Sequence, residues 1–261
     1  LPPLPTNTNT NTNTKCLHVR DETPIHRHQG YDLSSFYHLL QSVATSECAK
    51  TTLVFIYSTL APTTMNGFKR EYPQLHMFHV PEFLSSGSVV LDDVCPTRPR
   101  VLLGVPERTP ASVAERARVF LLQLVSASQT VVVVKSNESE ATKLFCNAFY
   151  AAKVQLCNEF YQLCKQHHIS YDMVRHLMLE NGWIHPMHTN VPGADGQLGF
   201  GGRCLPKDLE ALCLWSSAEQ KKNVDTHTTT KPTLQTSASV RISPPSVLQA
   251  VWKAHCERKE E

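Results

Sequence analysis

The sequence lacks any pair of cysteines in a C-x-x-C arrangement, although it holds nine cysteines and 13 histidines in 261 residues. Protein zinc sites are usually marked by such pairs, so we expect no metal centre. The cysteines are odd in number and scattered, which argues against a disulfide framework. Free thiols in a reducing cytoplasm fit this pattern better.

Long apolar runs are also missing. No stretch approaches the roughly 20 residues that a bilayer span requires, so we expect no membrane partner. The opening residues, "LPPLPTNTNT", have neither the basic nor the apolar segment of a secretion signal, which again favours a cytoplasmic location. A formal net charge of +2 gives no reason to expect a nucleic-acid partner.

Segments typical of strands and helices alternate in the first half of the chain. "TVVVVKS" (130–136) is a β-branched run of the kind found in strands buried on both faces. Thr109 and Pro110 are expected as the N-cap and first residue of a helix. This alternation predicts an α/β domain with a parallel sheet over residues 1–138, with a low-complexity loop at 7–14. The expected strands are 52–58, 75–80, 100–105 and 130–136, and the expected helices are 33–43 and 109–125.

The character changes after Ser139, where we expect a helical domain over residues 139–261. Residues 140–168 contain neither glycine nor proline and predict one long helix, and 170–182 predict a shorter one. The segment 216–245, rich in Thr, Ser, Lys and Pro, is expected to be a disordered insertion before a last helix at 245–261. The long helix should carry one apolar stripe, made of Leu144, Ala148, Ala151, Ala152, Leu156, Phe160 and Leu163.

The stretch "QLGFGGRCLPKDLEALCLW" (197–215) holds a cysteine between a glycine-rich turn and a helix. Glycines permit unusual backbone conformations and a close approach of ligands. Pro206 suits the first turn of a helix, so Cys204 should lie at the helix N-terminus. That position, with Arg203 and Lys207 nearby, favours a reactive thiolate, although a buried structural cysteine is the alternative.

Four further polar residues are candidates for the same chemistry. Glu82 follows a predicted strand, where open α/β sheets place ligands. Lys153 and Asn158 interrupt the long helix, and Asp208 follows Cys204. Taken singly, Glu82 could be a turn carboxylate, Lys153 a solvated charge and Asp208 an acid that compensates the helix dipole.

The order of four motifs is more specific than any single residue. "STLAPTT", "VPEFLSSGSV", "EATKLFCNAFYAAKVQLCNE" and "PMHTNVPGADGQLGFGGRCLPKD" follow one another between residues 52 and 215. This series resembles the UDP-glucose/GDP-mannose dehydrogenase family, and most closely its UDP-glucose branch. The resemblance implies the latter part of a Rossmann-like NAD-binding domain followed by an all-helical central domain that forms a homodimer.

The resemblance implies NAD-dependent oxidation of UDP-glucose to UDP-glucuronate through a cysteine thiohemiacetal and thioester. Cys204 would be the nucleophile, Lys153 would stabilise the oxyanion, and Asn158 would assist it. Glu82 would be the general base for hydrolysis, and Asp208 would orient water. The expected cofactor contacts are Thr6, Ser58, Thr59 and Lys207, and the expected substrate contacts are Phe83, Leu84, His188, Asn190, Phe200 and Gly201.

The chain also departs from the family pattern. It has no G-x-G-x-x-G turn for the cofactor pyrophosphate, Ser86 replaces a glutamate, and "NGWIHP" replaces "D-x-R-I-G". The resemblance therefore implies an enzyme cut at both ends, which we expect not to oxidise UDP-glucose measurably by itself. Two other hypotheses remain open. One is a non-catalytic paralogue that serves as a dimerisation module, and the other is a dehydrogenase for GDP-mannose or UDP-N-acetylmannosamine.

Overall fold

The computed structural model describes residues 16–19, 25–26, 30–83, 100–125, 130–227 and 246–258. The chain divides into two compact units. The division expected between residues 138 and 139 assigned the short segments 22–33 and 59–61 to the first domain, whereas they belong to the second unit. The first unit comprises Leu1–Asp21, Ser34–Ser58 and Pro62–Ser139, and the second comprises Glu22–Leu33, Thr59–Ala61 and Glu140–Glu261.

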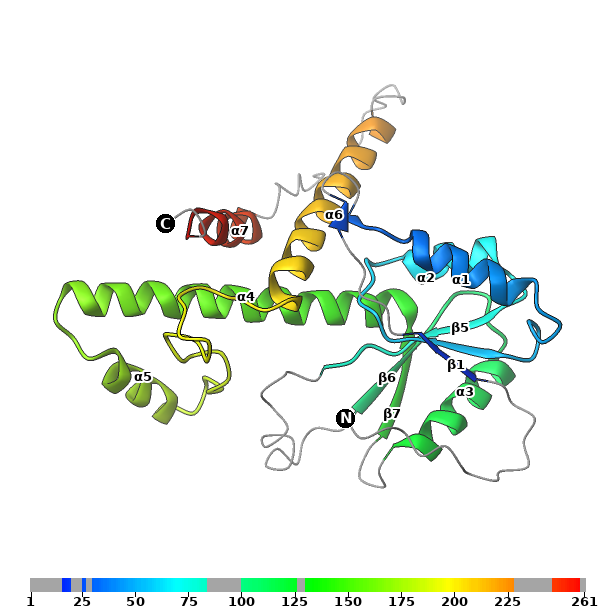
Figure 1. Ribbon diagram of the computed structural model, residues 1–261, viewed down its shortest axis with the longest axis horizontal. Coiled ribbons are helices and arrows are strands. Elements are labelled where there is room, and N and C mark those ends of the chain that lie inside the picture. Colours follow the sequence, from blue (N-terminus) through cyan, green and yellow to red (C-terminus); the bar gives the residue numbers. More distant parts are fainter. Residues whose placement is uncertain are drawn as a thin grey trace, which may run out of the picture. The chain divides into compact units, whose positions relative to one another are not determined.

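The first unit is the expected α/β domain, with helices beside a five-stranded sheet (Figure 1). The strands are arranged in the order β1-β4-β5-β6-β7, and three of the four neighbouring pairs are parallel. The exception is β5 with β6, which pair antiparallel through His79 and Gly104. The sheet is therefore mixed rather than wholly parallel. Its strands are β1 (Cys16–Val19), β4 (Leu53–Ile56), β5 (His76–His79), β6 (Arg100–Val105) and β7 (Thr130–Lys135).

Helices cover both faces of this sheet. Alternate residues of a strand point to opposite faces, so Phe55 and Phe78 share the face that packs against Ala117 and Leu121. Ala117 and Leu121 belong to α3. Phe36 of α1 and Phe68 of α2 stack on each other. The helices are α1 (Ser34–Ala44), α2 (Thr64–Glu71) and α3 (Ala111–Leu124).

Two local expectations for this unit were wrong. Strand β7 is not buried on both faces, since Val133 is 46% exposed. It is the last strand of the described sheet, and a β-branched run suits any pleated strand whether or not both faces are covered. Pro110, rather than Thr109, holds the cap position of α3 and makes no side-chain cap hydrogen bond. Its carbonyl accepts the first backbone hydrogen bonds of the helix instead.

The second unit is helical. Its long helix α4 begins at Ser136, directly after β7, so it starts earlier than expected and crosses the boundary between the units (Figure 1). Ser170 caps α5 as expected, because its side chain accepts from the Met173 N–H. A two-stranded antiparallel ribbon, β2 (Ile25–His26) and β3 (Gly30–Tyr31), completes the unit. The helices are α4 (Ser136–Gln166), α5 (Tyr171–Glu180), α6 (Cys204–His227) and α7 (Ser246–Arg258).

The apolar stripe expected along α4 divides into two parts. Leu144, Ala148 and Ala151 are buried with residues of α6 and α7. Leu156 and Leu163 are 50% and 52% exposed. The far part of α4 instead buries a different face, which carries Cys157 and Cys164, against Tyr171 and Val191. The helix therefore changes its packed face along its length, which leaves apolar side chains uncovered.

Helix α6 extends to His227, so the expected insertion is helical over residues 216–227, and residues 228–245 lie outside the described part. A run of Thr, Ser and Lys is compatible with a helix that is anchored at one end by packing. Among the described helices, none is long and apolar enough to cross a membrane.

Candidate functional site

The carboxylate of Asp208 lies at the centre of a buried hydrogen-bond cluster where α6 begins beside α4. Its Oδ1 accepts from the Tyr31 hydroxyl at 2.8 Å and from Lys207 Nζ at 2.6 Å. Its Oδ2 accepts from Asn147 Nδ2 at 2.5 Å and from Thr59 Oγ1 at 3.4 Å. The residue is 0% exposed. A carboxylate is an acceptor with about four lone-pair sites, so these donors match its capacity.

All residues of this cluster belong to the second unit, and they come from four separate segments. Tyr31 is on β3, Thr59 follows β4, Asn147 is on α4, and Lys207 is adjacent to Asp208 on α6. This arrangement explains why residues 22–33 and 59–61 belong to the second unit and not to the first. The alternative reading of Asp208 as a simple first-turn acid is wrong, because its charge is buried and fully engaged.

Cys204 is the first residue of α6 and is exposed. Gly199 and Gly202 in the preceding turn have φ of +83° and +74°, which explains why glycine occupies those positions. The thiol therefore lies at a helix N-terminus, a position that favours negative charge. The structure thus confirms the expected position of Cys204 at the helix start.

Lys143 is a further charged residue that interacts electrostatically with Asp208 and Cys204. Burial lowers the pKa of its ammonium, while the charges of Asp208 and Cys204 oppose that shift and Lys207 adds to it. Burial, and after it the charge of Asp208, raises the pKa of Tyr31 well above its ordinary value. Tyr31 therefore remains a protonated donor, and Lys143 is a partly desolvated cation beside the thiol and the carboxylate.

Lys153 and Asn158, the lysine and asparagine expected here, contact the loop between α5 and α6. Lys153 Nζ donates to the carbonyls of His185 and Met187, the latter at 2.7 Å. Asn158 donates to the Val154 carbonyl and accepts from the Gly199 N–H, both at 2.8 Å. Both side chains hold the loop between α5 and α6 in place.

The structure instead brings Lys143 and Asn147 to the site, and sequence reasoning missed both. Lys143 and Lys153 lie on one helix, and ten residues correspond to about 15 Å of helix axis. Only one of the two lysines can therefore adjoin Asp208. The available signal was the i,i+4 spacing of Lys143 and Asn147, which places both on one side of α4. The neighbouring Ala148 and Ala151 are small, and their size lets α6 approach α4 closely there. Tyr31 had no sequence signal, because its segment reaches the site from far along the chain.

The expected cofactor contacts are only partly described. Thr59 and Lys207 both donate to Asp208, and the ammonium of Lys207, whose side chain is 25% exposed, has three N–H groups in all. The Ser58 carbonyl, in the first unit, lies 3.2 Å from His79 Nε2. Thr6 lies outside the described residues.

The structure describes five of the six expected substrate contacts. Phe200 is buried in the helical core, where it stacks on His255 with ring centroids 4.1 Å apart. The ring of His188 is tilted against that of Tyr150 with centroids 4.9 Å apart, and burial lowers the pKa of His188. Asn190 and Gly201 are exposed. Glu82 and Phe83 follow β5 in the first unit, and Leu84 lies outside the described residues.

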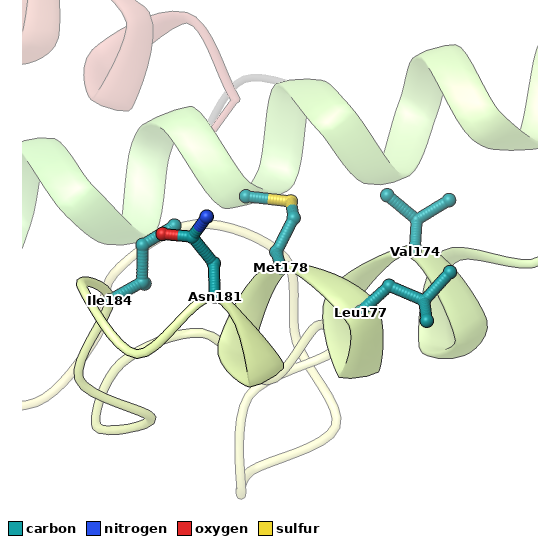
Figure 2. A pocket seen from close by; sticks show the side chains of 5 residues that line it. All are labelled: Val174, Leu177, Met178, Asn181 and Ile184. Atoms are coloured by element: carbon teal, nitrogen blue, oxygen red, sulfur yellow. The ribbon is translucent and has the colours of Figure 1, made fainter.

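Two hollows lie at the other end of α4, and neither is lined by Cys204 or Asp208. One, of about 550 Å³, is open and lies along α5 and the turn after it (Figure 2). The other, of about 340 Å³, lies between α4 and α5 and includes Lys153 and Arg175. In the described part of the chain, no group of three or more His, Cys, Asp or Glu side chains could hold a metal ion.

Comparisons with known proteins relate part of the chain to a known family. Residues 137–232 match the central domain of the UDP-glucose/GDP-mannose dehydrogenase family. This match covers less than half of the chain. The matched segment contains Lys143, Asn147, Cys204 and Asp208, and it confirms the resemblance drawn from the motifs.

Individual relatives cover more of the chain. The UDP-glucose 6-dehydrogenase of Campylobacter jejuni is 26% identical over 61% of this chain and 38% of its own length. The Pseudomonas aeruginosa enzyme of that name is 33% identical over 54% of this chain and 28% of its own length. The chain thus spans well under half of these relatives. The structure of a UDP-glucose dehydrogenase from Pyrobaculum islandicum shares the fold, with a TM-score of 0.69 and 23% identity over 94% of this chain and 51% of its own.

Proposed function

We propose that the second unit carries the reacting thiol centre of an NAD-dependent UDP-glucose 6-dehydrogenase. The observation that supports this most strongly is the grouping of Lys143, Asn147 and Asp208 at the point where α6 presents Cys204. The match of residues 137–232 to the central domain of that family supports nucleotide-sugar oxidation as the reaction class. The relatives' names favour UDP-glucose as the substrate.

The role of Cys204 is covalent. Its sulfur attacks the aldehyde carbon at C6 of the sugar and forms a carbon–sulfur bond, and the carbonyl oxygen takes up a proton to give a thiohemiacetal. At the thioester stage, water attacks the same carbon and the thiolate leaves. NAD is the hydride acceptor in the reaction that the resemblance implies. An exposed thiol at a helix N-terminus suits both the attack and the departure of sulfur.

Lys143 and Asn147 are the donors that we assign to an oxyanion beside that sulfur. A preorganised donor aimed at a developing oxyanion contributes roughly 3–4 kcal/mol in well-studied enzymes. Lys143 suits this role because burial has removed part of its hydration, which strengthens its interaction with a nearby negative charge.

Asp208 acts as a positioning group rather than as a base. Four side-chain donors already occupy its oxygens, and among them it fixes the buried Asn147 in place. Glu82, in the first unit, remains the candidate general base for hydrolysis of the thioester.

We also propose that a second copy of the chain covers the exposed apolar face of α4. Phe145, Phe149, Leu156 and Leu163 are 53%, 67%, 50% and 52% exposed. Their spacings of four and seven residues place them along one side of the helix, as in helices that pair. Trp183, after α5, is 91% exposed and adds to the apolar surface of this unit.

The test uses the 6-aldehyde of UDP-glucose, which needs no hydride transfer to react with a thiol. We expect it to protect Cys204 from iodoacetamide saturably, as read by mass spectrometry of the cysteine peptides. Cys256, an exposed free thiol on α7, is the internal control and should be unaffected. Equal protection by the 6-aldehyde of GDP-mannose would contradict the assigned substrate. No protection of Cys204 by either compound would contradict the proposed chemistry.

A further inference from the structure

Tyr31 contacts both members of the Lys207–Asp208 pair. Its hydroxyl donates to Asp208 Oδ1 at 2.8 Å, and Lys207 Nζ lies over its ring, 4.8 Å from the ring centre. Lys207 donates to that same Oδ1 at 2.6 Å. The phenol and the ammonium therefore share one carboxylate oxygen, while the face of the ring holds the ammonium by a cation–π contact.

Lys207 is also a neighbour of the thiol. Cys204 and Lys207 are three residues apart on α6, so their side chains lie on one side of the helix, about 5–6 Å apart at Cβ. The ammonium is thus placed between a buried carboxylate and an exposed sulfur. Its side chain is 25% exposed, whereas that of Asp208 is 1% exposed, so Lys207 is the member of the pair with room to move.

We propose that Tyr31 is a positioning residue that sets whether the ammonium of Lys207 lies closer to Asp208 or to Cys204. By donating to Oδ1, the phenol neutralises part of the carboxylate charge and weakens its hold on the ammonium. Without the hydroxyl, Oδ1 has Lys207 as its remaining donor, and the ammonium is drawn toward Asp208. Cys204 then has less positive charge beside its sulfur, which slows the reaction of that sulfur as a nucleophile.

This inference deepens the proposed function and rests on it for the identity of the reaction, but its test requires no turnover. The variant is Tyr31→Phe, which removes the hydroxyl and keeps the ring. Tyr171→Phe is the matched control. Tyr171 lies in the same unit, is likewise 7% exposed, and likewise donates one 2.8 Å hydrogen bond, to the Thr189 carbonyl. Both variants should lose similar stability.

The measurement is the rate at which iodoacetamide alkylates Cys204 in the full chain at pH 7. Groups in one hydrogen-bond network couple strongly enough to change a rate or equilibrium constant by about threefold or more. We expect Tyr31→Phe to slow alkylation by at least about threefold, and Tyr171→Phe to leave the rate unchanged. In a Lys207→Met background, the effect of Tyr31→Phe should disappear.

Two results would overturn the proposal. One is a Cys204 rate in Tyr31→Phe equal to that in Tyr171→Phe. The other is an undiminished effect of Tyr31→Phe in the Lys207→Met background. The aldehyde experiment separates this inference from the proposed function. If the aldehyde fails to protect Cys204 while Tyr31→Phe slows alkylation, the proposed reaction is wrong and the role of Tyr31 stands.

Discussion

Replacement of Asp208 by asparagine should destabilise the second unit strongly. The amide of Asn has one acceptor oxygen, and its NH₂ group would face donors that now point at a carboxylate oxygen. Removal of one partner from a buried ion pair costs about 3–5 kcal/mol. Since Lys207 is 25% exposed and can regain water, we expect the lower end, about 3 kcal/mol. That is a large part of the roughly 5–15 kcal/mol that stabilises a domain.

Tryptophan fluorescence isolates the unit in question, because Trp183, Trp215 and Trp252 all belong to it. Urea unfolding followed by this signal gives the free energy of unfolding for Asp208→Asn. The control is Asp195→Asn, the same change at an exposed turn, where we expect less than about 0.5 kcal/mol. A loss below about 1 kcal/mol for Asp208→Asn would refute the view that this carboxylate organises the unit.

Three further outcomes follow from other parts of the chain. Gly104→Ala should destabilise the first unit by about 1–3 kcal/mol in thermal unfolding, because a Cβ there would meet Ser139 Oγ at 2.1 Å; an unchanged melting temperature would contradict the close contact. Phe149→Glu should shift the chain toward monomer in sedimentation velocity at tens of micromolar, and no change would exclude this face of α4 from the interface. Burial raises the pKa of Cys213 to about 11, so at pH 8 it should react with iodoacetamide much more slowly than Cys204, and equal rates would contradict this account.

The helices and strands could largely be predicted from the sequence, because their patterns are local. The 3.6-residue periodicity of 33–43 and 170–182 and the capping Ser170 depend only on neighbours in the chain. The exposure of Val133 and the uncovered half of α4 could not be predicted. Both depend on which elements pack from elsewhere, and the periodicity of one segment carries no information about that.

The candidate site shows the same limit. Cys204 and Asp208 were found because a glycine-rich turn before a helix is a strong local signal. Two of the three lysines of the long helix are each followed within five residues by an asparagine, and periodicity alone did not decide between these two. Tertiary packing decides, because Lys143 and Asn147 lie beside the alanines that α6 approaches. Tyr31 reaches the same carboxylate across 177 residues of sequence, a contact that no local pattern records.

The central claim is that Lys143, and not Lys153, is the cation of the reacting centre. The most direct measurement is the rate of Cys204 alkylation by iodoacetamide at pH 7 in Lys143→Met and Lys153→Met. The account predicts at least about a threefold slower rate in Lys143→Met, because a nearby cation supports the thiolate. It predicts an unchanged rate in Lys153→Met, whose lysine holds the carbonyls of His185 and Met187. The account would be contradicted if alkylation of Cys204 were slower in Lys153→Met and unchanged in Lys143→Met.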